Sequence, residues 1–164
     1  MAFRKELKEQ LETGIVSRIP PKDVKFRNNV FLIQKKSGAW RQILDCRILN
    51  AAMKKVHFKC ENKRTVERLI MRNDFAVTMD LSQAYYLIPV SNKLRPYLTF
   101  RLKGLDYAFN GMPFGYTDAP RYFTKVMRKV KTEIKRKWNV RVTSNLDNLI
   151  LLHQDFNILK EITS

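Results

Sequence analysis

The sequence predicts an α+β fold, in which antiparallel strand pairs are combined with amphipathic helices. Several short β-branched or apolar runs are separated by glycine, serine or asparagine turns, which is typical of β-hairpins. Other segments repeat their apolar residues every three or four positions, which is typical of helices that pack on one face. About 45% of the 164 residues are apolar, which is enough for the core of one domain.

The first half of the chain predicts a helix, a hairpin and a second helix. Apolar residues recur at every fourth position between residues 3 and 11, and a glycine stop follows. The runs 30–34 and 40–45 flank a Ser-Gly turn and predict a hairpin with basic residues at its tip. Residues 62–72 predict a helix with one apolar face.

The second half predicts a strand, a hairpin and a long helix. Residues 75–80 form a strand-like run that ends in an acid, and the runs 97–102 and 105–110 flank a Lys-Gly turn. A turn rich in glycine and proline, residues 111–120, then opens a helix that continues to Trp138. The apolar stripe of that helix is expected to consist of Phe123, Val126, Met127, Val130, Ile134 and Trp138.

The stretch from Val140 to His153 predicts a β-hairpin with an acid at its tip. Strand-like residues flank a turn that carries Asp147, and Asp80 ends another predicted strand. Two carboxylates on neighbouring strand ends can converge on Mg²⁺, which takes oxygen ligands and few carboxylates. Such a pair is the core of a two-metal nucleotidyl-transfer site.

The strong positive charge favours a polyanionic partner. The chain has 32 Lys and Arg against 15 Asp and Glu, a net charge of +17. Nucleic acid is the first candidate and an acidic membrane the second. The long helix adds a dense basic face, which predicts contact with nucleic acid or an acidic partner. Its members are Lys125, Arg128, Lys129, Lys131, Lys135, Arg136 and Lys137.

The sequence predicts an intracellular protein, in the cytoplasm or the nucleus, that is not secreted. It has no run of 18 apolar residues, and its first residues lack the apolar core of a secretion signal. The partner we expect is nucleic acid, and not a membrane. Cys46, Cys60 and His57 match neither a disulfide framework nor a zinc pattern, so the cysteines are expected to be thiols in a reducing compartment.

Four ordered stretches together resemble a reverse transcriptase, an RNA-directed DNA polymerase. They are VFLIQKKSGAWRQILDCRILN, FAVTMDLSQAYYLIPV, YLTFRLKGLDYAFNGMPFGYTDAPRYFTKVM and NLDNLIL. The phrases HFKCENKRTVERLI and LRPYLTFR, with the MPFG turn, resemble most closely retrotransposons of the DIRS type, which encode a tyrosine recombinase.

The resemblance implies the fingers and palm of a right-hand polymerase, with an antiparallel palm sheet backed by helices. Residues 1–164 would form a single reverse transcriptase domain fragment without a thumb. Residues of about 1–72 would be mostly fingers, and residues of about 73–164 the palm with an intervening fingers segment. The fragment would belong to a longer polyprotein, a decayed element or a ribonucleoprotein.

The resemblance also implies a set of site residues. Asp80, the Leu81 carbonyl and Asp147 match metal ligands, and Asn148 stands where the family has a second acid. Tyr85 matches the residue that excludes a ribose 2′-hydroxyl, which favours deoxynucleotides. The loop 112–115 matches the stretch beneath the templating base. The implied contacts to the incoming dNTP are Lys35, Lys36, Arg41, Leu81, Ser82, Gln83, Ala84, Tyr85, Phe114 and Gly115.

The hairpin tip departs from the family pattern at Asn148 and at Asn145, where the family has an acid and an aromatic residue. Two Mg²⁺ or Mn²⁺ ions are expected in the family. The amide of Asn148 brings no charge, and one charge pair at about 4 Å is worth roughly 4 kcal/mol at an effective dielectric near 20. Asp80 and Asp147 could still hold one ion, which leaves the second in doubt. We therefore predict weak or absent polymerase activity.

Three functions stay open from the sequence. The chain could be a polymerase core that extends a primer on an RNA or DNA template. It could be an inactive polymerase-like domain that binds RNA or DNA, or a structural subunit of a ribonucleoprotein. Primer extension and the salt dependence of binding distinguish them.

Overall fold

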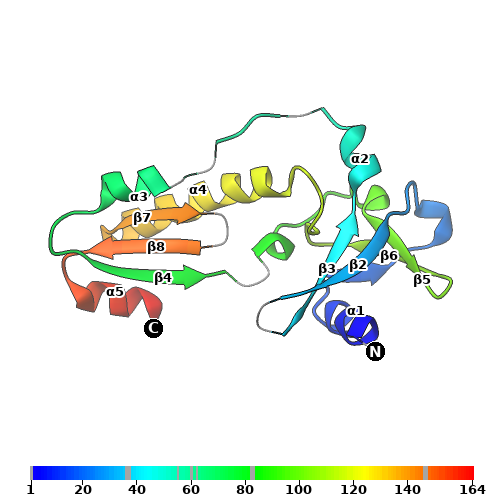
Figure 1. Cartoon of the computed structure of the whole chain (residues 1–164), viewed down its shortest axis with the longest axis horizontal. Coiled ribbons are helices and arrows are strands. Elements are labelled where there is room, and N and C mark those ends of the chain that lie inside the picture. The colour runs from blue at the N-terminus through cyan, green and yellow to red at the C-terminus, as the bar shows by residue number, and fades with distance from the viewer. Residues whose placement is uncertain are drawn as a thin grey trace. The chain divides into compact units, whose positions relative to one another are not determined.

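The computed structural model describes residues 2–164 except 36–37, 55, 60, 62, 82–83, 146–147 and the side chain of Asn145. The chain folds into two compact units, and each combines segments that are distant in the sequence (Figure 1). The first unit contains Met1–Val56 and Tyr85–Ala119, and the second contains His57–Ala84 and Pro120–Ser164. Helices and antiparallel sheets occur in both, so the predicted α+β class is confirmed.

The first unit contains a three-stranded sheet and a separate hairpin. The sheet has the order β1-β6-β5, and every pair in it is antiparallel. Its strands are β1 (Val16–Arg18), β5 (Thr99–Leu102) and β6 (Leu105–Phe109). The hairpin strands are β2 (Asn29–Gln34) and β3 (Trp40–Asp45), and the helices are α1 (Ala2–Glu12) and α2 (Arg47–Ala51). Short 3₁₀ turns are η1 (Pro21–Asp23), η2 (Ala84–Leu87), which begins at the last residue of a second-unit segment, and η3 (Arg95–Tyr97).

Aromatic packing holds the three-stranded sheet together. Phe100 and Phe109 are fully buried, and their rings lie 5.6 Å apart. Tyr107 stacks on Phe100 at 5.4 Å. Lys103 and Gly104, which join β5 to β6, have φ values of 48° and 79°, as a two-residue hairpin turn requires. The predicted hairpin is therefore confirmed.

The buried carboxylate of Asp106 binds two arginine side chains, Arg27 and Arg101. The Asp106 side chain is inaccessible to solvent. The Arg27 guanidinium donates two hydrogen bonds to it, at 2.9 and 3.0 Å, and Arg101 donates two more, at 2.9 and 2.7 Å. These hydrogen bonds hold the pKa of Asp106 well below its usual range despite its burial. The cluster is a structural anchor of the first unit.

The second unit is built on a sheet of the order β4-β8-β7, in which both pairs are antiparallel. Its strands are β4 (Phe75–Asp80), β7 (Arg141–Asn145) and β8 (Asn148–His153). Its helices are α3 (Lys63–Leu69), α4 (Ala119–Trp138, all but its first residue) and α5 (Phe156–Thr163). The helix α4 passes behind the sheet in Figure 1, whereas α5 packs on β4 and β8. Leu149, Leu151 and Leu152 of β8 are buried and supply much of the core.

Two features of the second unit differ from the sequence prediction. Val126 and Val130 are 44% and 38% exposed, so the buried stripe of α4 is narrower than expected. It follows Phe123, Met127 and Lys131, which are four residues apart and all buried. The helix α5 was not predicted, although Asp155 caps it by accepting a hydrogen bond from the Asn157 amide at 2.8 Å. None of the described helices is long and apolar enough to cross a membrane.

Candidate functional site

The second unit places Asp80 at the end of a strand, next to the predicted catalytic turn. Asp80 of β4 pairs with Asn148 of β8, and Asn148 pairs with Asn145 of β7. Directly opposite residues of an antiparallel pair lie on one face of a sheet, with Cβ atoms about 4.5–5.5 Å apart. Asp80 and Asn148 are both exposed there. Asp147, the other predicted acid, lies outside the described residues.

The oxygen atoms at this strand end suit a hard divalent cation. A carboxylate and an amide carbonyl are ligands that Mg²⁺ accepts, with water and substrate phosphates completing its shell. Among the described residues no group of three His, Cys, Asp or Glu side chains lies close enough to hold a metal. Asp80 and Asn148 supply one negative charge between them. The half-buried Leu81 follows Asp80 directly.

The first unit brings together four of the residues expected to contact a nucleotide. The Arg41 guanidinium lies over the Phe114 ring, 4.5 Å from its centroid, and the edge of Tyr85 meets the same ring at 5.1 Å. Gly115 follows Phe114. The Nε atom of Arg41 is buried and has no hydrogen-bond partner in the described part of the chain. A buried guanidinium nitrogen with a free N–H is suited to an anionic oxygen.

The loop that carries Phe114 is clamped to the β2–β3 hairpin. The Leu44 amide donates a hydrogen bond to the Phe114 carbonyl at 2.9 Å. Gly115 has a φ of +107°, and a Cβ atom there would collide with the Leu44 carbonyl oxygen. Asn50 fixes the loop from the other side, because its Nδ2 donates to the Gly115 carbonyl at 2.9 Å and its Oδ1 accepts from the Thr117 amide at 3.0 Å.

An open groove of about 420 Å³ lies beside this loop and the hairpin. Phe31 is 46% exposed in it, and Asp45 forms an ion pair with Arg47 at 2.7 Å. Hydrogen bonds from Arg47 lower the pKa of Asp45. The groove is large enough for a planar base. Its lining residues are Phe31, Ile43, Leu44, Asp45, Cys46, Arg47 and Gly115.

The remaining expected nucleotide contacts are divided among the units. Lys35 belongs to the hairpin turn, where its amide donates to the Ala39 carbonyl at 2.7 Å. Ala84 is buried and belongs to the second unit together with Leu81. Lys36, Ser82 and Gln83 lie outside the described residues.

The predicted basic face of α4 is exposed except at one position. Lys125, Arg128, Lys129, Lys135 and Arg136 are exposed. Lys131 is instead 6% exposed and forms an ion pair with Glu61 at 2.5 Å. The prediction that Lys131 lies on the solvent-facing side of the helix is therefore wrong. Arg136 also forms an ion pair with Glu133 at 2.8 Å, which lowers the net charge of the face.

Two residues that hold these sites were not predicted from the sequence. Asn50 clamps a loop that lies 65 residues further along the chain. Glu61 joins α4 to β7 by accepting hydrogen bonds from Thr143 Oγ1 at 2.7 Å and from the Ser144 amide at 2.8 Å. No local sequence pattern marks either residue, because each acts through partners that are distant in the sequence.

Comparison with known proteins finds the fold of this chain in reverse transcriptases. Residues 33–164 match the family model for reverse transcriptase (RNA-dependent DNA polymerase). Prototype foamy virus protease-reverse transcriptase superposes with a TM-score of 0.76 at 20% identity, covering 96% of this chain and 20% of that one. A foamy viral protease-reverse transcriptase in complex with double-stranded DNA gives a TM-score of 0.81 at 16% identity, covering 98% of this chain and 28% of that one.

Retroviral polyproteins are among the curated relatives of this chain. The Gag-Pro-Pol polyprotein of bovine leukemia virus is 26% identical over 148 residues, which are 85% of this chain and 10% of the relative. The Pol polyprotein of equine infectious anemia virus (isolate 1369) is 24% identical over 136 residues, which are 77% and 12%. The chain thus spans about a tenth of the length of these relatives.

The chain has the fingers-palm fold seen in these foamy virus reverse transcriptases. It belongs to the reverse transcriptase family.

Proposed function

We propose that the chain is the nucleotide-adding core of an RNA-directed DNA polymerase whose catalytic turn is impaired. The observation that carries this proposal is the exposed Asp80 at a strand end, opposite the hairpin residue Asn148. The Arg41 guanidinium above Phe114 supports it by offering a cation for a triphosphate.

In the proposed mechanism, the residues of this chain hold and orient the reactants. Asp80 and Asp147, with the Leu81 carbonyl, would hold Mg²⁺ or Mn²⁺. Such an ion lowers the pKa of a primer 3′-hydroxyl and neutralises the triphosphate. Arg41 and Lys35 would bind phosphate oxygens of the nucleotide. The open groove that Phe31 lines would receive a base of the template. Positioning and charge supply the catalysis.

The proposed impairment follows from Asn148. An amide at the second acidic position leaves the site one negative charge short, and each 1.4 kcal/mol lost at the transition state costs about tenfold in rate. We therefore propose an intact fold with one weakly held ion.

Primer extension on an RNA template with dNTPs and Mg²⁺ or Mn²⁺ tests this function. The unaltered chain is expected to extend weakly, Asn148→Asp to extend better, and Asp80→Asn not at all. Extension that is unchanged by Asp80→Asn would contradict the proposed site. Vigorous extension by the unaltered chain would contradict the impairment.

Nucleic-acid binding without catalysis is the second candidate, and the exposed basic face of α4 supports it. Affinity for single-stranded RNA or DNA is expected to fall steeply between low and moderate salt, because phosphate contacts release counterions. Affinity that is unchanged at high salt would contradict this candidate. It would favour the third possibility, a structural subunit of a ribonucleoprotein held by protein contacts.

The wider setting is also a proposal. The motif phrases quoted above support an origin in a retrotransposon of the DIRS type, within a longer polyprotein. An intracellular location, in the cytoplasm or the nucleus, suits a partner that is a template-primer.

A further inference from the structure

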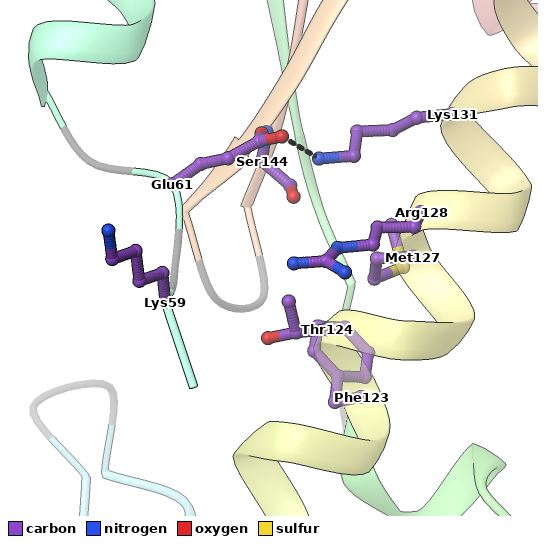
Figure 2. A pocket seen from close by; sticks show the side chains of 8 residues that line it. All are labelled: Lys59, Glu61, Phe123, Thr124, Met127, Arg128, Lys131 and Ser144. Carbon is purple, nitrogen blue, oxygen red and sulfur yellow. Dashed lines mark hydrogen bonds and ion pairs between the residues drawn. The ribbon is translucent and has the colours of Figure 1, made fainter. Parts of the chain in front are cut away.

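A small cavity in the second unit lies between α4, the end of β7 and the residues Lys59 and Glu61. Its volume is about 50 Å³. Since roughly 10–15 Å³ on this measure holds one water, the cavity has room for a small polyatomic ion but not for a nucleoside. Figure 2 shows the lining residues, which are Lys59, Glu61, Phe123, Thr124, Met127, Arg128, Lys131 and Ser144.

One wall of the cavity is a neutralised ion pair. Glu61 Oε1 binds the Lys131 ammonium at 2.5 Å, and Glu61 Oε2 accepts hydrogen bonds from Thr143 and from the Ser144 amide. Burial alone would raise the pKa of Glu61, but these contacts outweigh it and lower the pKa. Glu61 therefore stays ionised at neutral pH, and its charge is already balanced by Lys131.

Two cations at the cavity remain without a counterion. Lys59 and Arg128 both line it, and neither forms an ion pair with another residue of the described chain. Together with Lys131 they set three positive charges against the single carboxylate of Glu61. Figure 2 shows the Arg128 guanidinium reaching from α4 into the cavity, whereas the Lys59 ammonium points away from it. If Lys59 turns inward, the two like charges would repel, and an anion between them would relieve that repulsion.

We propose that this cavity binds one phosphate group. The Arg128 fork would hold two phosphate oxygens, the flexible Lys59 would turn inward to close the site, and the Ser144 hydroxyl would donate to a third oxygen. The phosphate is either a backbone diester of a nucleic-acid strand or a free phosphate ion. Only the first of these sources rests on the nucleic-acid binding proposed above.

Calorimetric titration with inorganic phosphate tests the site, in chloride buffers of matched ionic strength. Arg128→Ala is expected to weaken phosphate binding by at least about tenfold, because a charge-assisted pair is lost. Arg128→Lys keeps the positive charge but loses the two-pronged guanidinium, so its affinity for phosphate should lie between those of the unaltered chain and Arg128→Ala.

Lys160→Ala is the matched control, because it removes one positive charge from an exposed position on α5. It is expected to change the affinity for phosphate by less than about twofold. Thermal unfolding of each variant verifies that the fold is retained. Absence of phosphate binding to the unaltered chain would overturn the free-ion source.

Anisotropy titration with a single-stranded oligodeoxythymidine, which lacks a terminal phosphate, separates the two sources. A loss in Arg128→Ala of at least about tenfold, relative to Lys160→Ala, supports the backbone diester. If the strand binds while Arg128→Ala and Lys160→Ala behave alike in both titrations, the cavity is not a phosphate site and nucleic-acid binding stands. If inorganic phosphate binds through Arg128 but no strand binds, the cavity is a free-phosphate site and nucleic-acid binding fails.

Discussion

Asp80 at the end of β4 lies directly opposite Asn148 at the start of β8, and both residues are exposed. Replacing Asn148 by Asp would set two carboxylates side by side on one face of the sheet. We expect Asn148→Asp to bind Mn²⁺ at least about tenfold more tightly, since an added charge near 4 Å contributes several kcal/mol at most. Calorimetry with Mn²⁺ measures this. Adding Asp80→Asn should abolish the gain, and a gain that survives would place the ion elsewhere.

Tyr85 is expected to select deoxynucleotides. Its ring edge packs on Phe114, 5.1 Å between centroids, which fixes its orientation. In the Asn148→Asp background, Tyr85→Val should raise the incorporation of ribonucleotides relative to deoxynucleotides by about tenfold, because the bulk that excludes a 2′-hydroxyl is lost. Single-nucleotide extension measures this ratio. Tyr85→Phe keeps the bulk and should retain the selectivity, so an equal change in both variants would rule out exclusion by size.

Gly115→Ala is expected to destabilise the first unit by about 3 kcal/mol. The new methyl group would meet the Leu44 carbonyl oxygen, and the φ of +107° is unfavourable for alanine. Denaturant unfolding measures the loss. Gly104→Ala is the matched control, because it has a φ of +79° but nothing within 4 Å of the added Cβ, and it should cost only about 1 kcal/mol. Equal losses of stability in the two variants would show that the contact with the Leu44 carbonyl oxygen does not contribute.

Acid should weaken the first unit through Asp106. The pKa of Asp106 is lowered in the folded protein, so its contribution is complete above the unfolded pKa of about 3.9 and is lost as the pH falls below it. We expect Asp106→Asn to lower the melting temperature at neutral pH and to flatten its fall below about pH 4. Scanning calorimetry from acid to neutral pH measures both. Asp23→Asn, an exposed carboxylate, is the control, and identical acid profiles for the two variants would contradict the assignment.

The ion pair between the buried Lys131 and the partly exposed Glu61 should stabilise the second unit. Lys131→Met leaves the partly exposed Glu61 without its cation and is expected to cost about 2 kcal/mol, less than for a fully buried pair. Lys129→Met, on the exposed side of α4, should change stability by less than about 0.5 kcal/mol. Denaturant unfolding compares them.

The same pair gives a pH dependence. Glu61 has a lowered pKa, so its contribution is present above the unfolded value of about 4.3 and is lost in acid. Lys131→Met should therefore be less stable at neutral pH but lose less stability below about pH 4, because Glu61 no longer has the cation that lowers its pKa. Glu61→Gln added to it should recover part of the loss at neutral pH. A fall in stability with acid as steep as in the unaltered chain would show that the pair is not coupled to folding.

The parts of the fold that could be predicted are those encoded locally. The β5–β6 hairpin follows from the strand runs and the Lys103-Gly104 turn, and α4 follows from its apolar spacing. Asp80 could be placed at a strand end for the same reason, since the run before it has the strand pattern. Such features need only neighbouring residues.

The parts that could not be predicted depend on distant partners. Lys131 has the local sequence of a surface lysine, and only Glu61, 70 positions earlier, accounts for its burial. Val126 and Val130 have the spacing of core residues, yet the buried side of α4 is the adjacent one, which carries Phe123 and Met127. The clamp of Asn50 on Gly115 needs two segments that meet only after folding.

The close approach of Gly115 to Leu44 has a mechanical consequence. No side chain separates the two backbones, and the Leu44 amide donates a hydrogen bond to the Phe114 carbonyl. We therefore expect the loop that carries Phe114 and the β2–β3 hairpin to move together. A hairpin that swings toward a substrate must carry the Phe114 ring with it. A displacement of the hairpin is therefore expected to displace the Phe114 ring, on which the Arg41 guanidinium lies.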